Sequence, residues 1–446
     1  MGFKRKIYNQ IKEWKEEKNK NSALLIEGAR RVGKTTIVKE FAKNEYNNFI
    51  YIDFTYATDN LKNLFKKINP AIKLSMDQFF SDLFLSCDNV LKKGDLIIFD
   101  EVQHFPLARQ AIKALVADGR FDYIETGSLI SIRENTQDIQ IPSEERRIEM
   151  HPMDFEEFCW AFDWNNKCNM LRDILEQHKN ISENAHQQLM EDFRLYLALG
   201  GMPKVISLYK ETNSFMRCEK EKQDILKLYE DDLRKHDNKC KTHTLNIYNS
   251  MLPALKSWSK RIKTNSKSHS MTRLYQRSLK DLEDSKIVNS VYRSTDLSFG
   301  SFIKEENNFK LYPLDVGLML SALIGDINED CEKTYLKIRT GKIEGANFGA
   351  LYESLVLQSL ICNDRKVLYH TFEYNNKRYE IDFVSFIKGK MNAIEVKSTK
   401  RFTTSSLSTL KLKYPQLKFK KIIVSPKPLR YEDDTIFLPI YMTFLL

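Results

Sequence analysis

Short apolar runs separated by helical stretches dominate the first third of the chain. Between residues 21 and 153 these runs are "ALLIEG", "NFIYIDFT", "DLIIFDE", "DYIETGS" and "RRIEMHPM". Runs of this length that are apolar almost throughout are typical of strands buried on both faces, and intervening helices favour parallel pairing. The pattern therefore predicts an α/β fold whose parallel sheet is covered by helices on both sides.

The pattern changes after residue 153. Residues 154–237 show mainly helical periodicity, broken at "LGGMP", where two glycines and a proline end one helix and start the next. Residues 238–300 predict helices followed by a β-wing, and the remainder mixes strands with helices such as 347–362. We expect four domains: an α/β domain (1–153), a helical lid (154–237), a winged-helix-like domain (238–300) and a second α/β domain (301–446).

A glycine-rich segment, "GARRVGKTT", follows the first predicted strand and precedes a predicted helix. It satisfies the spacing GxxxxGK[ST], in which backbone N–H groups and a helix N-terminus surround phosphate oxygens. We expect Lys34 to contact the β- and γ-phosphates of ATP and Thr35 to coordinate Mg²⁺. Arg30 and Arg31 are expected to face a neighbouring subunit or domain. The predicted loop comprises Gly28, Ala29, Arg30, Arg31, Val32, Gly33, Lys34, Thr35 and Thr36.

The next strands supply partners for this loop. "LIIFDE" ends in Asp100, expected to hold Mg²⁺, and Glu101, expected to polarise the attacking water, so the pair indicates ATP hydrolysis. In "ETGS", Thr126 or Ser128 would sense the γ-phosphate, with a plain turn as the alternative. Arg146 or Arg147 would serve as an arginine finger across a subunit interface of a homo-oligomer. A solvated strand start is the alternative for these two arginines.

The order of these motifs is distinctive. "LLIEGARRVGKTT", "IIFDEVQ", "ETGS", "MHPMDFEEF" and "YLALGGMP" resemble the prokaryotic ATP-binding proteins that pair an AAA-type ATPase domain with a C-terminal DUF4143 domain. The resemblance covers nearly the whole chain. It implies an AAA-type P-loop fold for the first domain and a DUF4143 fold for the last.

Two strands of the last domain carry a second set of charged residues. "YEIDFV" and "AIEVKS" form a predicted hairpin with Asp382, Glu395 and Lys397, and Glu353 lies on an upstream helix. These residues resemble the PD-(D/E)xK nuclease superfamily, in which carboxylates bind Mg²⁺ or Mn²⁺ and a lysine activates water for phosphodiester cleavage. The alternative is a salt-bridged strand pair in a nuclease-like domain that cuts nothing.

Charge favours an anionic partner. The chain has 70 Lys and Arg against 60 Asp and Glu, a formal net charge of +10. Residues 238–280 and 396–431 contain no acid, and such one-signed stretches are favourable mainly when an anion lies against them. We expect DNA as the partner, read by Arg273 and Arg277, with a membrane surface as the weaker choice. A winged helix used only for packing is the alternative.

The cysteines and the apolar runs of the sequence indicate the cellular compartment. Its seven cysteines show no metal-ligand spacing, and we expect reduced thiols in a cytoplasmic protein. No apolar run approaches the roughly 20 residues of a membrane span, and the final "TIFLPIYMTFLL" predicts a closing strand. The interpretation is an ATPase whose nucleotide cycle controls DNA engagement, with metal-dependent cleavage left open. A nucleotide-gated switch that binds a protein partner is the alternative.

Overall fold

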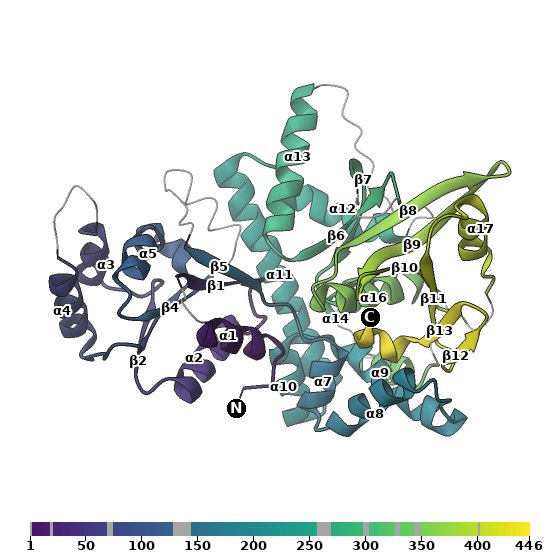
Figure 1. Cartoon of the computed structure of the whole chain (residues 1–446), viewed down its shortest axis with the longest axis horizontal. Helices are drawn as coiled ribbons and strands as arrows, with labels where there is room; N and C mark the ends of the chain where they lie inside the picture. The colour runs from purple at the N-terminus through teal and green to yellow at the C-terminus, as the bar shows by residue number, and fades with distance from the viewer. Residues whose placement is uncertain are drawn as a thin grey trace. The chain divides into compact units, whose positions relative to one another are not determined.

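The computed structural model describes residues 2–17, 21–68, 75–127, 144–256, 269–297, 303–325, 331–342, 348–399 and 402–446. It divides into two compact units, each built around its own sheet (Figure 1). Unit 1 comprises Met1–His151 together with Asp284–Lys286, and unit 2 comprises Pro152–Glu283 and Ile287–Leu446. The chain therefore passes between the units after residues 151, 283 and 286. The four-domain division stays a prediction.

The sheet of unit 1 has five strands in the order β2-β3-β4-β1-β5. Every strand pair in it is parallel, which confirms the predicted parallel sheet. All residues of β1 and β3 are buried, because helices cover both faces of the sheet. The strands are β1 (Ala23–Glu27), β2 (Phe49–Asp53), β3 (Leu96–Asp100), β4 (Asp122–Gly127) and β5 (Glu145–Glu149).

The helices of unit 1 begin at recognisable caps. The Thr58 and Ser75 side chains accept N–H bonds at the starts of α3 and α4, and Pro106 opens α5. These three helices pack on one face of the sheet through an aromatic cluster that includes Phe65, Phe79 and Phe99. The helices are α1 (Ile7–Glu16), α2 (Lys34–Glu45), α3 (Asp59–Lys66), α4 (Met76–Cys87), η1 (Val102–His104) and α5 (Pro106–Asp118).

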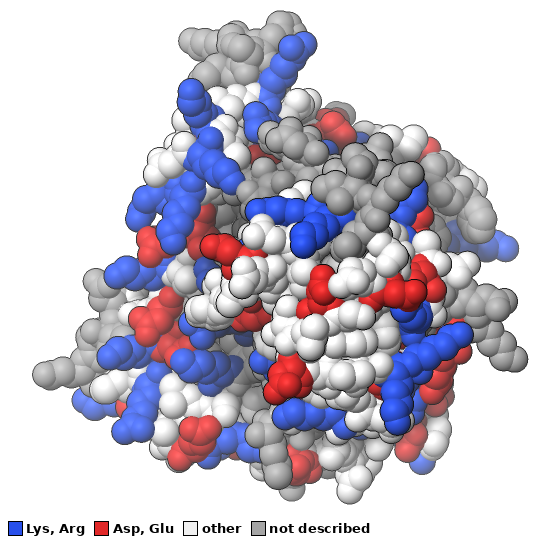
Figure 2. Space-filling model, turned by 90° about the vertical axis from the view of Figure 1, so that its left-hand side faces the viewer, with Lys and Arg blue, Asp and Glu red and all other residues white. Residues whose placement is uncertain are grey.

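Surface charge is mixed on the face shown in Figure 2. Lys and Arg side chains there are interspersed with Asp and Glu side chains over most of the described surface. The formal net charge of +10 is therefore not gathered into one continuous field on this face. A basic site has to be sought in particular clusters of residues.

The helical part of unit 2 follows the sequence prediction closely. Asp154, Ser182 and Ser214 cap three of its helices by accepting backbone N–H bonds. The predicted break at "LGGMP" lies between α9 and α10. The helices are α7 (Phe155–Ala161), α8 (Asn165–Glu176), α9 (Glu183–Leu199), α10 (Pro203–Thr212), α11 (Phe215–Cys240), α12 (Thr244–Lys256) and α13 (His269–Asp284).

The glycines of this break allow two backbones to touch. A Cβ added to Gly200, which has φ +77°, would lie 2.8 Å from the Cα of Gly317 at the start of α14. Asp315 caps α14 and also accepts the Gly201 N–H at 2.6 Å. Because no side chain fits between these segments, residues near the end of α9 and the start of α14 are fixed together.

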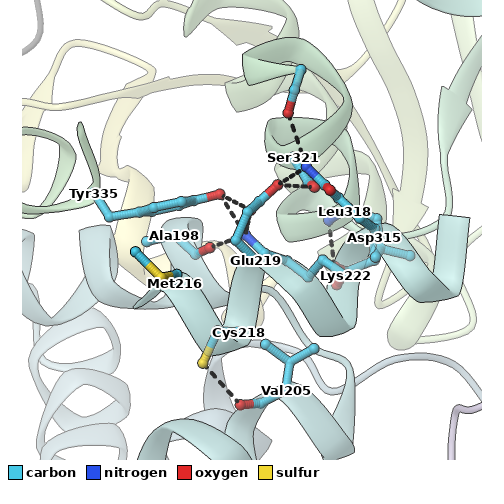
Figure 3. Close-up of polar contacts among 12 residues, drawn as sticks. Ala198, Val205, Met216, Cys218, Glu219, Lys222, Asp315, Leu318, Ser321 and Tyr335 are labelled. Atoms are coloured by element: carbon cyan, nitrogen blue, oxygen red, sulfur yellow. Dashed lines mark hydrogen bonds and ion pairs between the residues drawn. The ribbon is translucent and has the colours of Figure 1, made fainter. Parts of the chain in front are cut away.

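A buried ion pair joins the helical part to the following segment (Figure 3). Lys222 Nζ lies 3.0 Å from Glu219 Oε2, and both side chains are almost fully buried. Lys222 also donates to the Ala198 carbonyl at 2.9 Å, while Ser321 and Tyr335 donate to Glu219. Burial lowers the pKa of Lys222, and the neighbouring carboxylate limits that fall. The network therefore connects α9 and α11 with α14 and α15 inside unit 2.

The sheet of unit 2 has eight strands in the order β12-β13-β11-β10-β9-β8-β6-β7. The strand expected as the wing is β6, which pairs antiparallel with β7 and parallel with β8 as part of this larger sheet. The winged-helix assignment stays a prediction. The strands are β6 (Val288–Ser294), β7 (Lys304–Pro313), β8 (Val367–Tyr374), β9 (Lys377–Ile387), β10 (Lys390–Val396), β11 (Phe419–Ser425), β12 (Arg430–Glu432) and β13 (Thr435–Pro439).

Helices complete unit 2 and end the chain. They are α14 (Val316–Ile324), α15 (Cys331–Arg339), α16 (Phe348–Cys362), α17 (Ser405–Lys413) and η2 (Ile440–Leu445). The predicted closing strand is only half correct, since its second half forms the 3-10 helix η2. Pairing of β13 with β11 ends at Pro439, which has no N–H to continue the ladder. No helix among the described residues is long and apolar enough to cross a membrane.

Candidate functional site

The loop between β1 and α2 has the backbone that its glycines allow. Gly28 has φ +149° and Gly33 has φ +105°, values that side chains rarely tolerate. A Cβ on Gly28 would lie 2.4 Å from the Met150 carbonyl oxygen. Ala29 and Val32 are buried, whereas Arg30, Arg31 and Thr36 are exposed. The loop is thus anchored by its apolar residues, and its two arginines are exposed; their contact with a neighbouring subunit or domain stays a prediction.

Lys34 begins α2 and lies under the loop. Its ammonium group donates to the Gly28 and Ala29 carbonyls, both at 2.9 Å, and its side chain is only 6% exposed. Burial lowers the pKa of Lys34 to about 8, although Glu101 and Asp100 oppose the shift. Lys34 is therefore held at the loop and is charged at neutral pH.

The Asp100 carboxylate accepts hydrogen bonds from hydroxyl groups on three elements. Thr35 Oγ1 donates to Asp100 Oδ2 at 2.9 Å, the Tyr51 hydroxyl donates to the same oxygen at 2.5 Å, and Thr126 Oγ1 donates to Oδ1. These residues come from α2, β2 and β4, all around the carboxyl end of β3. The structure brings the predicted Thr35, Asp100 and Thr126 together. All three donors are uncharged hydroxyl groups, so none of them forms an ion pair with this carboxylate.

Glu101 follows in a left-handed conformation, with φ +55° and ψ +47°. Such a conformation is uncommon for a residue with a side chain and often occurs at functional sites. Its N–H lies 3.4 Å from Thr126 Oγ1, and the Gln103 side chain donates to its carboxylate. The turn therefore follows Asp100 directly and brings the Glu101 carboxylate to the Gln103 side chain. Ser128, the other predicted sensor, lies outside the described residues.

Two residues at this site were missed by the sequence analysis. Tyr51 lies on β2, whose parallel register places Asp53 opposite Asp100, so its position beside β3 could have been inferred from strand order. Arg5 donates to the Val32 carbonyl at 2.9 Å and to the His151 carbonyl at 2.6 Å. No sequence motif indicates that Arg5 holds the loop in this way, because its contacts are to backbone oxygens.

The two arginines of β5 form ion pairs within unit 1. Arg146 lies 3.2 Å from Glu17, and Arg147 lies 3.7 Å from Glu27 and 3.5 Å from Glu145. Both arginine side chains are nevertheless more than two-fifths exposed. Their role as arginine fingers stays a prediction.

The predicted residues of the last domain lie on α16, β9 and β10. Glu353 accepts a hydrogen bond from the Tyr312 hydroxyl at 2.8 Å, and Asp382 accepts one from the Val396 N–H at 2.8 Å. Lys397 Nζ lies 2.9 Å from Glu395 Oε2. The Glu395 side chain is 1% exposed, whereas the Lys397 side chain is 27% exposed, so only the carboxylate of this ion pair is shielded from water.

A second lysine belongs to this group and was not predicted. Lys310 on β7 is fully buried, and its ammonium group donates to Glu380 Oε1 at 2.6 Å. Burial alone would lower the pKa of Lys310. The negative charges around it more than offset burial and raise its pKa; they belong to Glu353, Glu380 and Asp382. We call Lys310 and these three carboxylates, together with Glu395 and Lys397, the carboxylate–lysine cluster.

This cluster does not fit a divalent metal as it stands. Lys397 already pairs with Glu395, one of the predicted metal ligands. The charge of Lys310 acts on the other two, Glu353 and Asp382. A metal ion would be repelled by both ammonium groups. Among the residues that the structure describes, no group of three or more His, Cys, Asp and Glu side chains is arranged to hold a metal ion. No chemical step through a metal in unit 2 is therefore derived.

Three protein-family models match the chain. An AAA domain matches residues 20–159, and DUF4143, a domain of unknown function, matches residues 348–443. The chain pairs an AAA domain with a DUF4143 domain. Between them, residues 190–329 match DUF8612, another domain of unknown function. The AAA match covers the loop, Asp100, Glu101 and Thr126, and the DUF4143 match covers most of the carboxylate–lysine cluster.

Solved structures show limited similarity to the chain. The Walker-type ATPase PABY2304 of Pyrococcus abyssi is 16% identical, with 72% of this chain and 96% of that chain covered and a TM-score of 0.39. The Aeropyrum pernix ORC1 protein in complex with DNA is 12% identical, with coverages of 74% and 93% and a TM-score of 0.28. No curated protein sequence matches the chain. The domain assignment therefore rests on the family models.

Proposed function

We propose that the protein is a Mg²⁺-dependent ATP hydrolase whose nucleotide cycle controls nucleic-acid engagement by unit 2. The observation that carries the ATPase part is the set of three hydroxyl groups around Asp100, beside a glycine loop and a buried lysine. This arrangement supplies a charged carboxylate, a cation for phosphate and a second carboxylate, Glu101, for water. It fits both ATP and Mg²⁺.

Each residue has a definite task in that proposal. Lys34 would exchange its two carbonyl partners for phosphate oxygens, while the loop N–H groups hold the same phosphates. Thr35 and Asp100 would hold Mg²⁺, which, when bound, offsets charge on the β- and γ-phosphates. Glu101 would accept a hydrogen bond from the attacking water, and Thr126 would link the Asp100 carboxylate to the backbone at Glu101.

Engagement of DNA is supported by charge on α13. Arg273, Arg277 and Lys280 are exposed and three or four positions apart, so they share one face of the helix. Such a face suits a row of phosphates or the edge of a major groove. Four further lysines and arginines of this acid-free stretch, at 260, 261, 263 and 267, lie outside the described residues.

A second candidate is a nucleotide-gated switch that binds a protein partner and has a catalytically silent nuclease-like domain. The ion pairs of Lys310 with Glu380 and of Lys397 with Glu395 favour this candidate over metal-dependent cleavage. Cleavage would require these lysines to release their carboxylates to a metal. A homo-oligomer is compatible with both candidates, through an arginine finger from a second copy.

One experiment separates the candidates. Wild type, Lys34→Ala and Lys397→Ala are compared for ATP hydrolysis with and without DNA, and for DNA cleavage with Mg²⁺ or Mn²⁺. The proposal expects hydrolysis in wild type and Lys397→Ala, its loss in Lys34→Ala, and stimulation by DNA. Hydrolysis that is slow and indifferent to DNA supports the switch. Absence of hydrolysis in wild type would falsify the ATPase proposal.

A further inference from the structure

A cavity of about 540 Å³ lies at one end of the eight-stranded sheet. It is found where the turn between β9 and β10 lies beside the start of β11. Its volume is within the range of roughly 300 to 1000 Å³ that is usual for ligand pockets. The apolar residues around it are Leu297, Phe386, Met391, Leu417 and Phe419, and its lysines are Lys390, Lys418 and Lys420.

The charge around this cavity has one sign. Lys390 and Lys418 immediately precede Met391 and Phe419, which are paired in the parallel register of β10 and β11. Like charges on adjacent strand positions repel each other. No acidic residue lines the cavity, and none of its three exposed lysines forms an ion pair or side-chain hydrogen bond with another described residue. A bound anion would relieve this repulsion.

The aromatic residues suggest which anion. Phe386 and Phe419 are only partly buried, and they lie at the edge of the core cluster beneath α17. Aromatic rings beside lysines in one cavity are the combination that binds single-stranded nucleic acids, with bases stacked on the rings and phosphates beside the lysines. The acid-free stretch 396–431, with ten Lys and Arg, contains two of the lining lysines.

We propose that this cavity receives one unpaired nucleotide of a single-stranded nucleic acid. The base lies against Phe386 and Phe419, and the adjoining phosphates lie against Lys390 and Lys418. A base inside a duplex stays stacked between its neighbours and cannot enter unless it is flipped out. This inference rests on the proposed engagement of nucleic acid by unit 2. It adds that unit 2 selects single-stranded over double-stranded nucleic acid.

The test measures fluorescence anisotropy of a labelled single-stranded oligonucleotide and of its duplex, with full-length protein and no ATP. Wild type should bind the single strand more tightly than the duplex. The double variant Lys390→Gln/Lys418→Gln should lower single-strand affinity about tenfold and reduce the dependence of affinity on salt. Phe419→Leu should lower single-strand affinity about fivefold, because a base loses its stacking partner.

A matched control is Lys179→Gln/Lys235→Gln, which removes two exposed lysines of the helical part and should leave affinity unchanged. Thermal unfolding verifies that each variant is folded. Wild type that prefers the duplex overturns the inference and leaves the proposed function intact, whereas wild type that binds neither form overturns both. The inference is also overturned if Lys390→Gln/Lys418→Gln binds the single strand as tightly as the control variant does. That result is the one expected if the cavity receives a lipid or a protein segment instead.

Discussion

Carboxylates of the two units are stabilised by different partners. Asp100 in unit 1 accepts hydrogen bonds from the hydroxyl groups of Thr35, Tyr51 and Thr126, which carry no charge. Glu380 and Glu395 in unit 2 are instead paired with lysine ammonium groups at 2.6 and 2.9 Å. Hydroxyl donors orient a carboxylate and leave its charge available, whereas ammonium groups neutralise it. The same residue type can thus be prepared for a metal in one place and serve as an internal ion pair in another.

The largest effect that tests this comparison is expected from Lys310→Met. The substitution leaves the buried Glu353 and the partly exposed Glu380 and Asp382 without their cation, and we expect a loss of about 3 kcal/mol in the free energy of unfolding. Urea unfolding followed by circular dichroism measures it. Lys304→Met changes an exposed lysine of the same strand and should shift stability by less than about 0.5 kcal/mol. Added Mn²⁺ should restore part of the lost stability only in Lys310→Met, and equal unfolding of the two variants would contradict the counter-ion role.

In unit 1 the corresponding change is Asp100→Asn. An amide keeps the shape but loses the charge, and we expect ATP hydrolysis to fall at least about a hundredfold. Steady-state phosphate release at varied Mg²⁺ concentration measures the loss. The matched substitution in unit 2, Asp382→Asn, should leave the rate within about twofold. Similar losses in both variants would remove the distinction between the two carboxylate sites.

The pH dependence of nucleotide affinity tests the charge on Lys34. With a pKa of about 8, this ammonium group is charged below pH 8 and increasingly neutral above it. Phosphate binds the charged form, so ATP affinity should be greatest below pH 8 and fall about tenfold from roughly pH 7 to pH 9. Equilibrium binding of a fluorescent ATP analogue at each pH measures this fall in affinity. In Lys34→Arg, which stays charged, the decline should vanish whatever the absolute affinity.

The smallest expected effect is that of Tyr51→Phe. It removes one of three hydroxyl donors to Asp100, and we expect Mg²⁺ to be required at about fivefold to tenfold higher concentration for half-maximal ATP hydrolysis. Tyr56→Phe is the control, since Tyr56 is 83% exposed and its ring lies outside the site. A requirement for Mg²⁺ that is unchanged in Tyr51→Phe would show that Thr35 and Thr126 alone suffice to hold the carboxylate.

The fold of unit 1 could be predicted well because its signals are local. The run "DLIIFDE" predicts a strand within one residue of β3, Leu96–Asp100, and Asp100 follows from its place at the strand end. Parallel pairing follows from apolar runs separated by helices. The lysine at position 34 and its loop were likewise evident, because spacing alone defines that motif.

Contacts between distant positions were not predictable in the same way. Lys310 and Glu380 are 70 positions apart, and only the order of strands in the second sheet brings them together. No periodicity in the sequence distinguishes Lys310 from a solvated lysine. The wing was predicted within residues 238–300, and the pairing of β6 with β8, about 75 positions further along the chain, was not part of that prediction. Strand register across such distances depends on tertiary packing, which a single sequence does not encode locally.

The short return of residues 284–286 to unit 1 affects how the protein can be dissected. Lys286 on this segment donates to Glu149 of β5 at 2.6 Å, beside the strand that leads into the glycine loop. One protease cut after residue 151 separates Met1–His151 from the rest of the chain, while residues 284–286, the remaining part of unit 1, stay bonded to unit 2 on both sides. A recombinant fragment ending at residue 151 would also lack Lys286. Unit 1 is therefore better expressed with residues 284–286 attached through a designed linker than as a simple N-terminal truncation.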